Sequence, residues 1–170
     1  MIRLAKYSDL KIILEIYNDA ILNTTAIYDY KLHTIEDRTS WYEEKIQNGL
    51  PVLVFEEGNR VVGFATFGPF RDWPAYKYTI EHSVYVHKDY RGRHIGIKLM
   101  KELIKIANER GYATMVAGID ADNEVSKIMH EKLGFSFSGT IQKVGYKFEK
   151  WLNLDFYQYE LLGPEQPTEE

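Results

Sequence analysis

Hydrophobic positions recur with helical spacing in several stretches of the chain. In the clearest of them, Ile97 to Arg110, apolar residues mark one face of a helix and Gly111 follows as a stop signal. Thr34 and Asp37 have the spacing of a capping box, which starts a helix. The pattern predicts helices at residues 9–21, 35–49, 97–110 and 123–133.

Runs rich in β-branched and aromatic residues lie between these helices and predict strands. The predicted strands are residues 2–4, 52–55, 61–67, 78–86, 114–119, 135–141 and 148–161. Their order along the chain, strand-helix-helix-strand-strand-strand-helix-strand-helix-strand-strand, predicts a mixed α/β fold with helices on both faces of one sheet. No linker interrupts the pattern, so we expect a single domain over residues 1–162 and a disordered C-terminal tail over residues 163–170.

Composition narrows the classes of protein that fit. The chain has 170 residues, of which 45% are hydrophobic and 27% charged, as is ordinary for a globular domain with a core. The net charge of −4 does not suggest a nucleic-acid partner. With no Cys and no metal-binding spacing among the five His, we expect no disulfide, cysteine nucleophile or metal site.

The hydrophobic pattern of the sequence predicts no targeting signal. No apolar run approaches the ~20 residues of a membrane-spanning helix, and the first residues lack the apolar core of a signal peptide. We therefore expect a cytoplasmic protein that does not associate with membranes.

The segment from Tyr90 to Gly96 carries the most chemical information. It follows a predicted strand, opens a predicted helix and contains Arg91, Gly92 and Arg93. Glycines let the backbone approach a ligand, and a helix N-terminus with nearby arginines suits a pyrophosphate. The segment predicts a phosphorylated cofactor, although an ordinary strand–helix turn with a solvated basic rim would have similar residues.

Two separated motifs resemble those of the GNAT acetyltransferase superfamily. The loop resembles Arg/Gln-x-x-Gly-x-Gly/Ala, which binds acyl-CoA in that superfamily, with His94 in place of the first Gly. Asn123-x-x-Ser126 followed by Leu133-Gly134-Phe135 resembles its second signature. The segments 68–71, 78–86 and 145–158 are similar to phosphinothricin and methionine sulfone/sulfoximine N-acetyltransferases, and the resemblance covers residues 2–161. It implies the GNAT fold, with a mixed, mostly antiparallel central sheet.

The resemblance also implies catalytic roles. Glu81 stands where the family has its general base, which takes the proton of the ammonium group. The N–H of Val84 is expected to polarise the acetyl carbonyl. His130 occupies the position of a Tyr general acid in many members. The alternatives are a plain edge-strand charge for Glu81 and a packed, non-transferring imidazole for His130, while strand alternation argues against a dyad of Glu81 and His82.

Binding residues follow from the same comparison. The residues implied for acetyl-CoA are Val84, Tyr85, Val86, Arg91, Gly92, Arg93, His94, Ile95, Gly96, Ile97, Asn123 and Lys132. The residues implied for the acceptor are Arg71, Asp72, Trp73, Glu81, His82 and Ser83, with an arginine suited to its carboxylate. Asn123 would equally serve as a helix N-cap, and Lys132 as a surface lysine.

The predicted activity is transfer of an acetyl group from acetyl-CoA to the α-amine of a small amino-acid analogue. Because the chain has no Cys nucleophile, we expect direct attack in a ternary complex. Relatives imply a homodimer. The alternatives are a GNAT enzyme for another amine, such as a polyamine or a protein N-terminus, and a non-catalytic acyl-CoA sensor.

Overall fold

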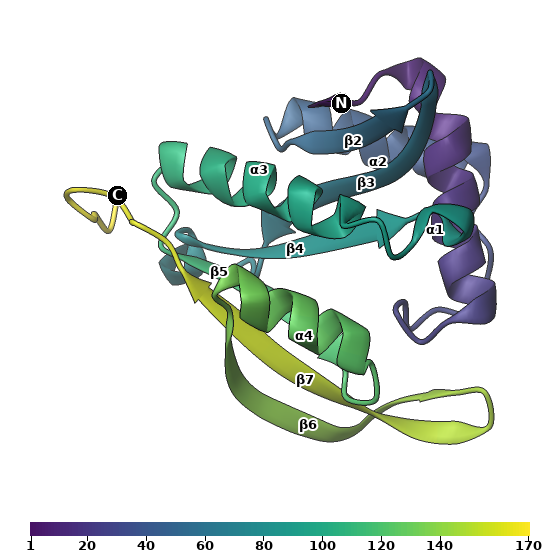
Figure 1. Ribbon diagram of the computed structural model, residues 1–170. Helices are drawn as coiled ribbons and strands as arrows, with labels where there is room; N and C mark the ends of the chain where they lie inside the picture. The colour runs from purple at the N-terminus through teal and green to yellow at the C-terminus, as the bar shows by residue number, and fades with distance from the viewer. The chain divides into compact units, whose positions relative to one another are not determined.

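The computed structural model describes all residues, Met1–Glu170, and its helices and strands follow the predicted order (Figure 1). The helices are α1 (Leu10–Asn23), α2 (Ile35–Gln47), α3 (Ile95–Glu109) and α4 (Glu124–Leu133). The strands are β1 (Ile2–Leu4), β2 (Val52–Glu57), β3 (Arg60–Pro69), β4 (Thr79–Val86), β5 (Thr114–Asp120), β6 (Ser136–Lys147) and β7 (Lys150–Glu160). Short 3₁₀ turns lie at Tyr7–Asp9, Pro74–Tyr76 and Lys88–Tyr90.

The predicted fold class is confirmed. Hydrogen-bonded strands follow the order β1-β2-β3-β4-β5-β7-β6 in a seven-stranded sheet. The pairs β1–β2, β2–β3, β5–β7 and β6–β7 are antiparallel, and β4 and β5 run parallel. The sheet is therefore mixed and mostly antiparallel.

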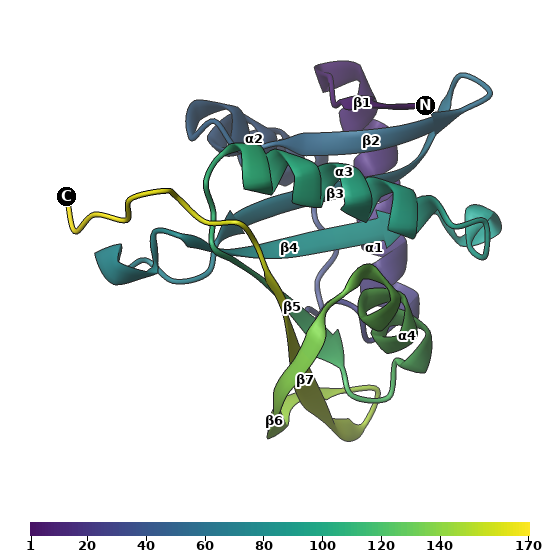
Figure 2. The same ribbon diagram turned by 60° about the vertical axis from the view of Figure 1, so that its left-hand side comes forward.

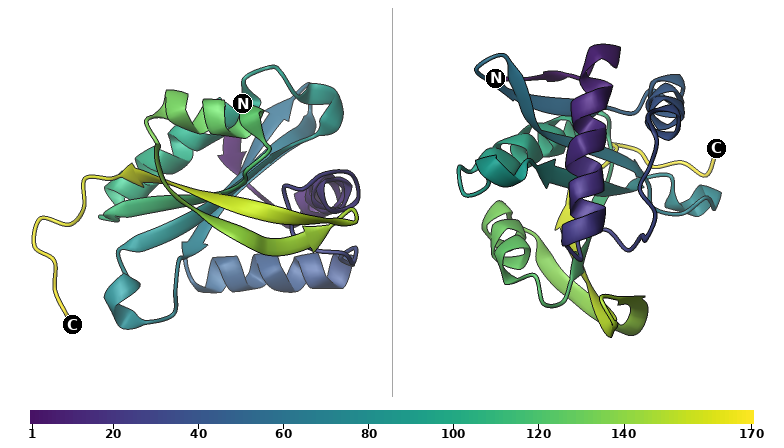
Figure 3. Two further views of the ribbon diagram at one scale, coloured as in Figure 1. Left: turned by 90° about the horizontal axis from the view of Figure 1, so that it is seen from below. Right: turned by 90° about the vertical axis from the view of Figure 1, so that its right-hand side faces the viewer.

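The predicted boundaries of the last two strands differ from the structure, because β6 continues to Lys147, beyond residue 141, and β7 begins only at Lys150. The sequence pattern placed Phe148 at the start of the last strand, but Phe148 and Glu149 form the turn of the long β6–β7 hairpin (Figure 3). Both residues have positive φ, 52° and 60°, as a tight hairpin turn requires. Such turns usually carry Asn or Gly, and neither residue stands at this point, so no turn was predicted here.

The chain divides into two compact units. The first unit contains Met1–Phe67 and Ser83–Met100, and the second contains Gly68–His82 and Lys101–Glu170. Strand β4 and helix α3 each continue from one unit into the other.

In the first unit, helices cover both faces of the strands (Figure 2). On one face, residues of α1, α2, β2 and β3 form a core, with Ile13, Val54 and Phe64 almost fully buried. On the other face, a Cβ added to Gly63 of β3 would lie only 3.2 Å from Ile95 and 3.3 Å from Leu99. The first turns of α3 therefore pack directly on β3, and Gly63 makes this close approach possible.

In the second unit, α4 packs on β7. Lys127 of α4 forms an ion pair of 3.3 Å with Asp155 of β7. Gly134 ends α4 in the left-handed conformation, with φ 106°, directly after the predicted end of this helix at residue 133. The segment after Gly163 forms no helix or strand, although the amide of Thr168 donates to the Tyr78 hydroxyl at 3.0 Å. None of the helices is long and apolar enough to cross a membrane.

Candidate functional site

The loop singled out in the sequence leads directly into α3. Gly92 has a φ of 78°, and a Cβ added to it would meet no atom within 4 Å. The first helical hydrogen bond runs from the Lys98 amide to the His94 carbonyl at 3.1 Å. The amides of Ile95, Gly96 and Ile97 therefore have no acceptor inside the helix, and they provide donors and a positive dipole end that fit a pyrophosphate.

The two arginines of this loop lie at its rim. Arg91 Nη2 is 3.5 Å from Asp19 Oδ2, and Arg93 Nη1 is 3.1 Å from Glu57 Oε2. Both side chains are exposed, so these ion pairs are weak and both guanidinium groups can exchange an acid for a phosphate.

Glu81 is half-buried on the more open side of β4. Strand alternation separates it from Ile80 and His82, which are buried. A Cβ added to Gly118 of β5 would lie 3.4 Å from Glu81 Oε1, so the absence of a side chain at Gly118 leaves room for the carboxylate. Burial raises the pKa of Glu81, and the positive charge of Arg71 offsets part of that rise. A carboxylate with a raised pKa is the better proton acceptor.

His82 and His130 form a buried pair. Their Nε2 atoms are 2.9 Å apart and their rings stack. His130 is 2% exposed and His82 8% exposed. Burial lowers the pKa of both imidazoles, that of His82 well below its ordinary value, so the pair is neutral at pH 7. The expectation that His82 would not pair with Glu81 agrees with this geometry.

Hydrogen-bond chemistry assigns the protons of the pair. His130 Nδ1 lies 2.7 Å from the Ser126 carbonyl, which can only accept, so this nitrogen carries the proton. His130 Nε2 then accepts from Nε2–H of His82. His82 Nδ1 is left as a buried lone pair with no partner. In this arrangement His130 has no uncommitted N–H to give to a leaving thiolate.

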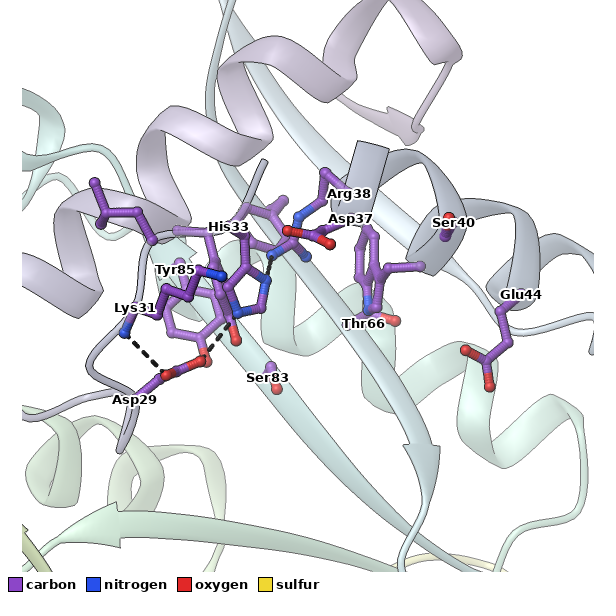
Figure 4. Close-up of a pocket in the computed structure, with 14 residues that line it drawn as sticks. Asp29, Lys31, His33, Asp37, Arg38, Ser40, Glu44, Thr66, Ser83 and Tyr85 are labelled. Atoms are coloured by element: carbon purple, nitrogen blue, oxygen red, sulfur yellow. Dashed lines mark hydrogen bonds and ion pairs between the residues drawn. The ribbon is translucent and has the colours of Figure 1, made fainter. Parts of the chain in front are cut away.

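A cavity of about 680 Å³ lies in the first unit (Figure 4). Its walls come from α1, α2, β3, β4 and the loop after α1. Ser83 and Tyr85 contribute from β4. The sequence analysis missed the wall formed by α2, where Arg38 and Trp41 line the cavity. The sequence feature that could have indicated this wall is the spacing of Arg38 and Trp41, which lie three residues apart and therefore on one face of α2.

Comparison with known proteins agrees with this geometry. The model of the Acetyltransferase (GNAT) family matches residues 13–135. The chain belongs to the GNAT acetyltransferase family.

Several relatives of this GNAT acetyltransferase are similar over nearly their full length. The L-amino acid N-acyltransferase MnaT of Escherichia coli is 42% identical over 98% of this chain and 96% of the relative. The L-methionine sulfoximine/L-methionine sulfone acetyltransferase of Salmonella typhimurium is 43% identical over 94% of each chain. The phosphinothricin N-acetyltransferase of Streptomyces viridochromogenes is 32% identical over 98% of this chain and 92% of the relative.

Solved structures match equally well. An N-acetyltransferase from Staphylococcus aureus superposes with a TM-score of 0.93 and 56% identity, over 94% of this chain and 97% of that one. The yncA structure from Salmonella typhimurium, solved with its cofactor acetyl-CoA, has a TM-score of 0.95 and 42% identity, over 99% and 97% of the two chains. A ribosomal-protein-alanine N-acetyltransferase from Brucella melitensis has a TM-score of 0.93 and 44% identity, over 95% and 99%.

As a GNAT acetyltransferase the chain uses acetyl-CoA as its acetyl donor, and the helix N-terminus at α3 fits the pyrophosphate of that molecule. The structure contains no group of three or more His, Asp or Glu that could hold a metal ion. The role of each site residue stays a prediction.

The other predicted residues lie in different environments. Asn123 caps α4, because its side-chain oxygen accepts from the Ser126 amide at 3.1 Å. Lys132 is exposed in the last turn of α4. Asp72 and Trp73 are exposed in the loop before β4, whereas His82 is enclosed by its contact with His130.

His94 departs from the family motif at a strained position. Its φ is 60°, which is costly for a residue with a Cβ, and its side chain is exposed.

Replacing His94 with Gly is expected to stabilise the protein by about 1 kcal/mol, because glycine adopts positive φ without steric strain. For a chain of this size the melting temperature rises by roughly 2–4 °C. His94→Ala is the matched control, since it removes the imidazole and keeps the Cβ, and no such rise is expected. Thermal unfolding of the three proteins decides this, and equal melting temperatures for the two variants would contradict the assignment of strain.

The His82–His130 pair predicts a loss of stability in acid. Burial lowers the pKa of both His82 and His130, so near pH 6.5 the unfolded chain binds protons that the folded pair does not bind. The pair's contribution to the free energy of unfolding is complete above about pH 6.5. Below that pH it falls by about 1.4 kcal/mol per pH unit for each proton that only the unfolded chain binds. We expect His82→Gln, which keeps a donor to His130, to lose less unfolding free energy between pH 7.5 and 5.5 than the wild type. Parallel pH profiles from denaturant unfolding would show that the pair is not responsible.

Proposed function

We propose that this acetyltransferase moves the acetyl group of acetyl-CoA to the α-amine of a small amino-acid analogue such as methionine sulfone, methionine sulfoximine or phosphinothricin. One observation carries the proposal: Glu81 is half-buried beside Gly118, and burial raises the pKa of the Glu81 carboxyl. The names of the relatives supply the acceptor class.

The amine must lose a proton before it attacks the thioester carbon. In the proposal Glu81 takes this proton, directly or through one water molecule. The Val84 amide donates a hydrogen bond to the carbonyl oxygen as negative charge develops there. Val84, Tyr85 and Val86 hold the pantetheine arm through their backbone, and the start of α3 holds the pyrophosphate.

The thiolate that leaves must gain a proton. His130 is the predicted donor, but its Nδ1–H is bonded to the Ser126 carbonyl. To donate this proton, His130 must release the carbonyl and gain a proton at Nε2, the nitrogen that now accepts from His82. The homodimer and the cytoplasmic location predicted from sequence belong to the same proposal.

One solved structure supports a second candidate acceptor. The Brucella melitensis relative, at 44% identity, is named for alanine at a ribosomal-protein terminus. A panel of acceptors separates the two activities: methionine sulfone, methionine sulfoximine, phosphinothricin, spermidine and a short peptide with N-terminal alanine. Thiol release from acetyl-CoA with the first three acceptors alone is expected. Release with the peptide alone would replace the proposed acceptor class.

Glu81→Gln is expected to lower kcat about 100-fold or more, because general-base catalysis contributes roughly 10²–10⁴ in rate. The change removes the proton acceptor and keeps the shape, so acetyl-CoA binding measured by calorimetry should be almost unchanged. An equal loss of turnover and of acetyl-CoA affinity in this variant would contradict the role of Glu81 as the base.

Arg71→Ala is expected to shift the acidic limb of the kcat/KM profile to higher pH. The Arg71 charge lowers the pKa of Glu81, so its removal leaves burial unopposed and the base form appears only at higher pH. Arg71→Lys retains the charge and should leave the limb near its wild-type position. If the limb does not move in Arg71→Ala, either Glu81 is not the titrating base or Arg71 does not act on it.

A further inference from the structure

The cavity of the first unit contains a buried cation that has no acidic partner. Arg38 of α2 is 2% exposed and lines the cavity (Figure 4). Its Nε has no hydrogen-bond partner. The nearest nitrogen contact is long, 3.5 Å from Nη2 to His33 Nδ1. A buried arginine is rare without a carboxylate or another anion beside it.

Two aromatic rings hold the guanidinium in place. Its Cζ lies 4.1 Å from the ring centre of Tyr17 on α1 and 4.5 Å from that of Trp41 on α2. Stacking of this kind occupies the planar faces of the group and leaves its N–H edge for hydrogen bonds. That edge is the part of an arginine that matches a carboxylate.

Three acids line the cavity, Asp29, Asp37 and Glu44, and the first two are engaged elsewhere. Asp29 accepts from His33 Nε2 at 3.0 Å and from the amides of Tyr30 and Lys31. Asp37 accepts from the Thr34 amide at 2.8 Å in the capping box of α2. The negative charge of Asp37 favours the charged form of Arg38, but no ion pair joins Arg38 to Asp29, Asp37 or Glu44. Lys31 and His33 add positive or neutral groups to the same wall.

Lys45, two turns further along α2, is a half-buried cation that has a hydrogen-bond acceptor. Its Nζ donates to the Phe67 carbonyl at 2.8 Å, and burial lowers its pKa to about 8. A lysine can lose its proton to relieve burial, whereas the guanidinium of Arg38 stays charged. Arg38 therefore has a buried N–H donor without an acceptor and a positive charge that it keeps at all ordinary pH values.

We propose that Arg38 binds the carboxylate of the acceptor amino acid in this cavity, an inference that rests on the proposed function. The cavity includes Ser83 and Tyr85, and on β4 Ser83 follows Glu81 by two residues, so strand alternation turns both side chains to the same face. The sequence analysis had assigned the carboxylate to Arg71. Arg71 is exposed and stacks on Phe70 at 5.1 Å, so it lacks the enclosure that Arg38 has.

A matched pair of ligands tests the assignment. L-Methionine sulfone and 3-(methylsulfonyl)propylamine differ only in the carboxylate, so the ratio of their dissociation constants, measured by calorimetry, isolates its contribution. The wild type should bind the amino acid about 10- to 100-fold more tightly, as expected for hydrogen bonds to a charged group. Arg38→Met should bind both ligands alike, and Arg38→Lys should retain part of the preference.

Lys45→Met is the control for loss of a half-buried cation from α2. It should lower thermal stability, as Arg38→Met does, while keeping the preference for the carboxylate, because Lys45 does not line the cavity. If Arg38→Met does not fold, the test uses the ratio of the two dissociation constants in Arg38→Lys. This variant keeps the positive charge and loses the paired N–H groups of the guanidinium.

A second readout separates this inference from the proposed function. Titration of the wild type with acetate should shift the NMR signal of Arg38 Nε–H, assigned by its absence in Arg38→Lys. If acetate shifts the signal but methionine sulfone is neither bound nor acetylated, the carboxylate site stands and the proposed acceptor is wrong. An unmoved signal, or a preference retained in Arg38→Met and lost in Arg71→Ala, overturns the inference.

Discussion

Strand β4 presents successive side chains to two different faces, and the chemistry of the site depends on this alternation. Ile80 and His82 are buried, and Thr79, Glu81 and Ser83 are more open. One strand thus supplies both a buried imidazole and a half-buried carboxylate. It also joins the two compact units of the chain, since its first residues belong to one and its last residues to the other. A change of register in β4 by one residue would exchange the roles of Glu81 and His82.

Burial of charge distinguishes the groups of the site. Glu81 is held where burial and the charge of Arg71 act on its pKa in opposite directions. His82 and His130 are enclosed more completely and remain neutral, each using the other as a hydrogen-bond partner. Arg38 cannot become neutral, and no ion pair holds it, so in the proposal a ligand supplies the anion that it lacks.

The fold and the cofactor loop could be predicted from the sequence because their signals are local. Helical spacing, the Thr34–Asp37 capping box and the stop at Gly134 each depend on residues a few positions apart, and all three are found in the structure. The loop before α3 was recognised for the same reason. The positive φ of His94, Phe148 and Glu149 was not foreseen, because none of these residues is the glycine that usually marks such a backbone.

The partners of the site residues could not be predicted. His82 and His130 are 48 residues apart, and sequence periodicity gives no information on contacts across that separation. The stack of Arg38 on Tyr17 and Trp41 joins two helices whose relative position depends on tertiary packing. Sequence therefore identified the residues with suitable chemistry near β4 and the loop, and missed the wall of the cavity on α2.

Direct attack of the amine on acetyl-CoA is the central claim, and an initial-rate grid tests it most directly. Thiol release would be measured while acetyl-CoA and methionine sulfone are varied together. A ternary complex predicts double-reciprocal lines that intersect. Parallel lines would reveal an acetylated enzyme intermediate, which a chain without Cys is not expected to form through a thioester, and would contradict direct transfer.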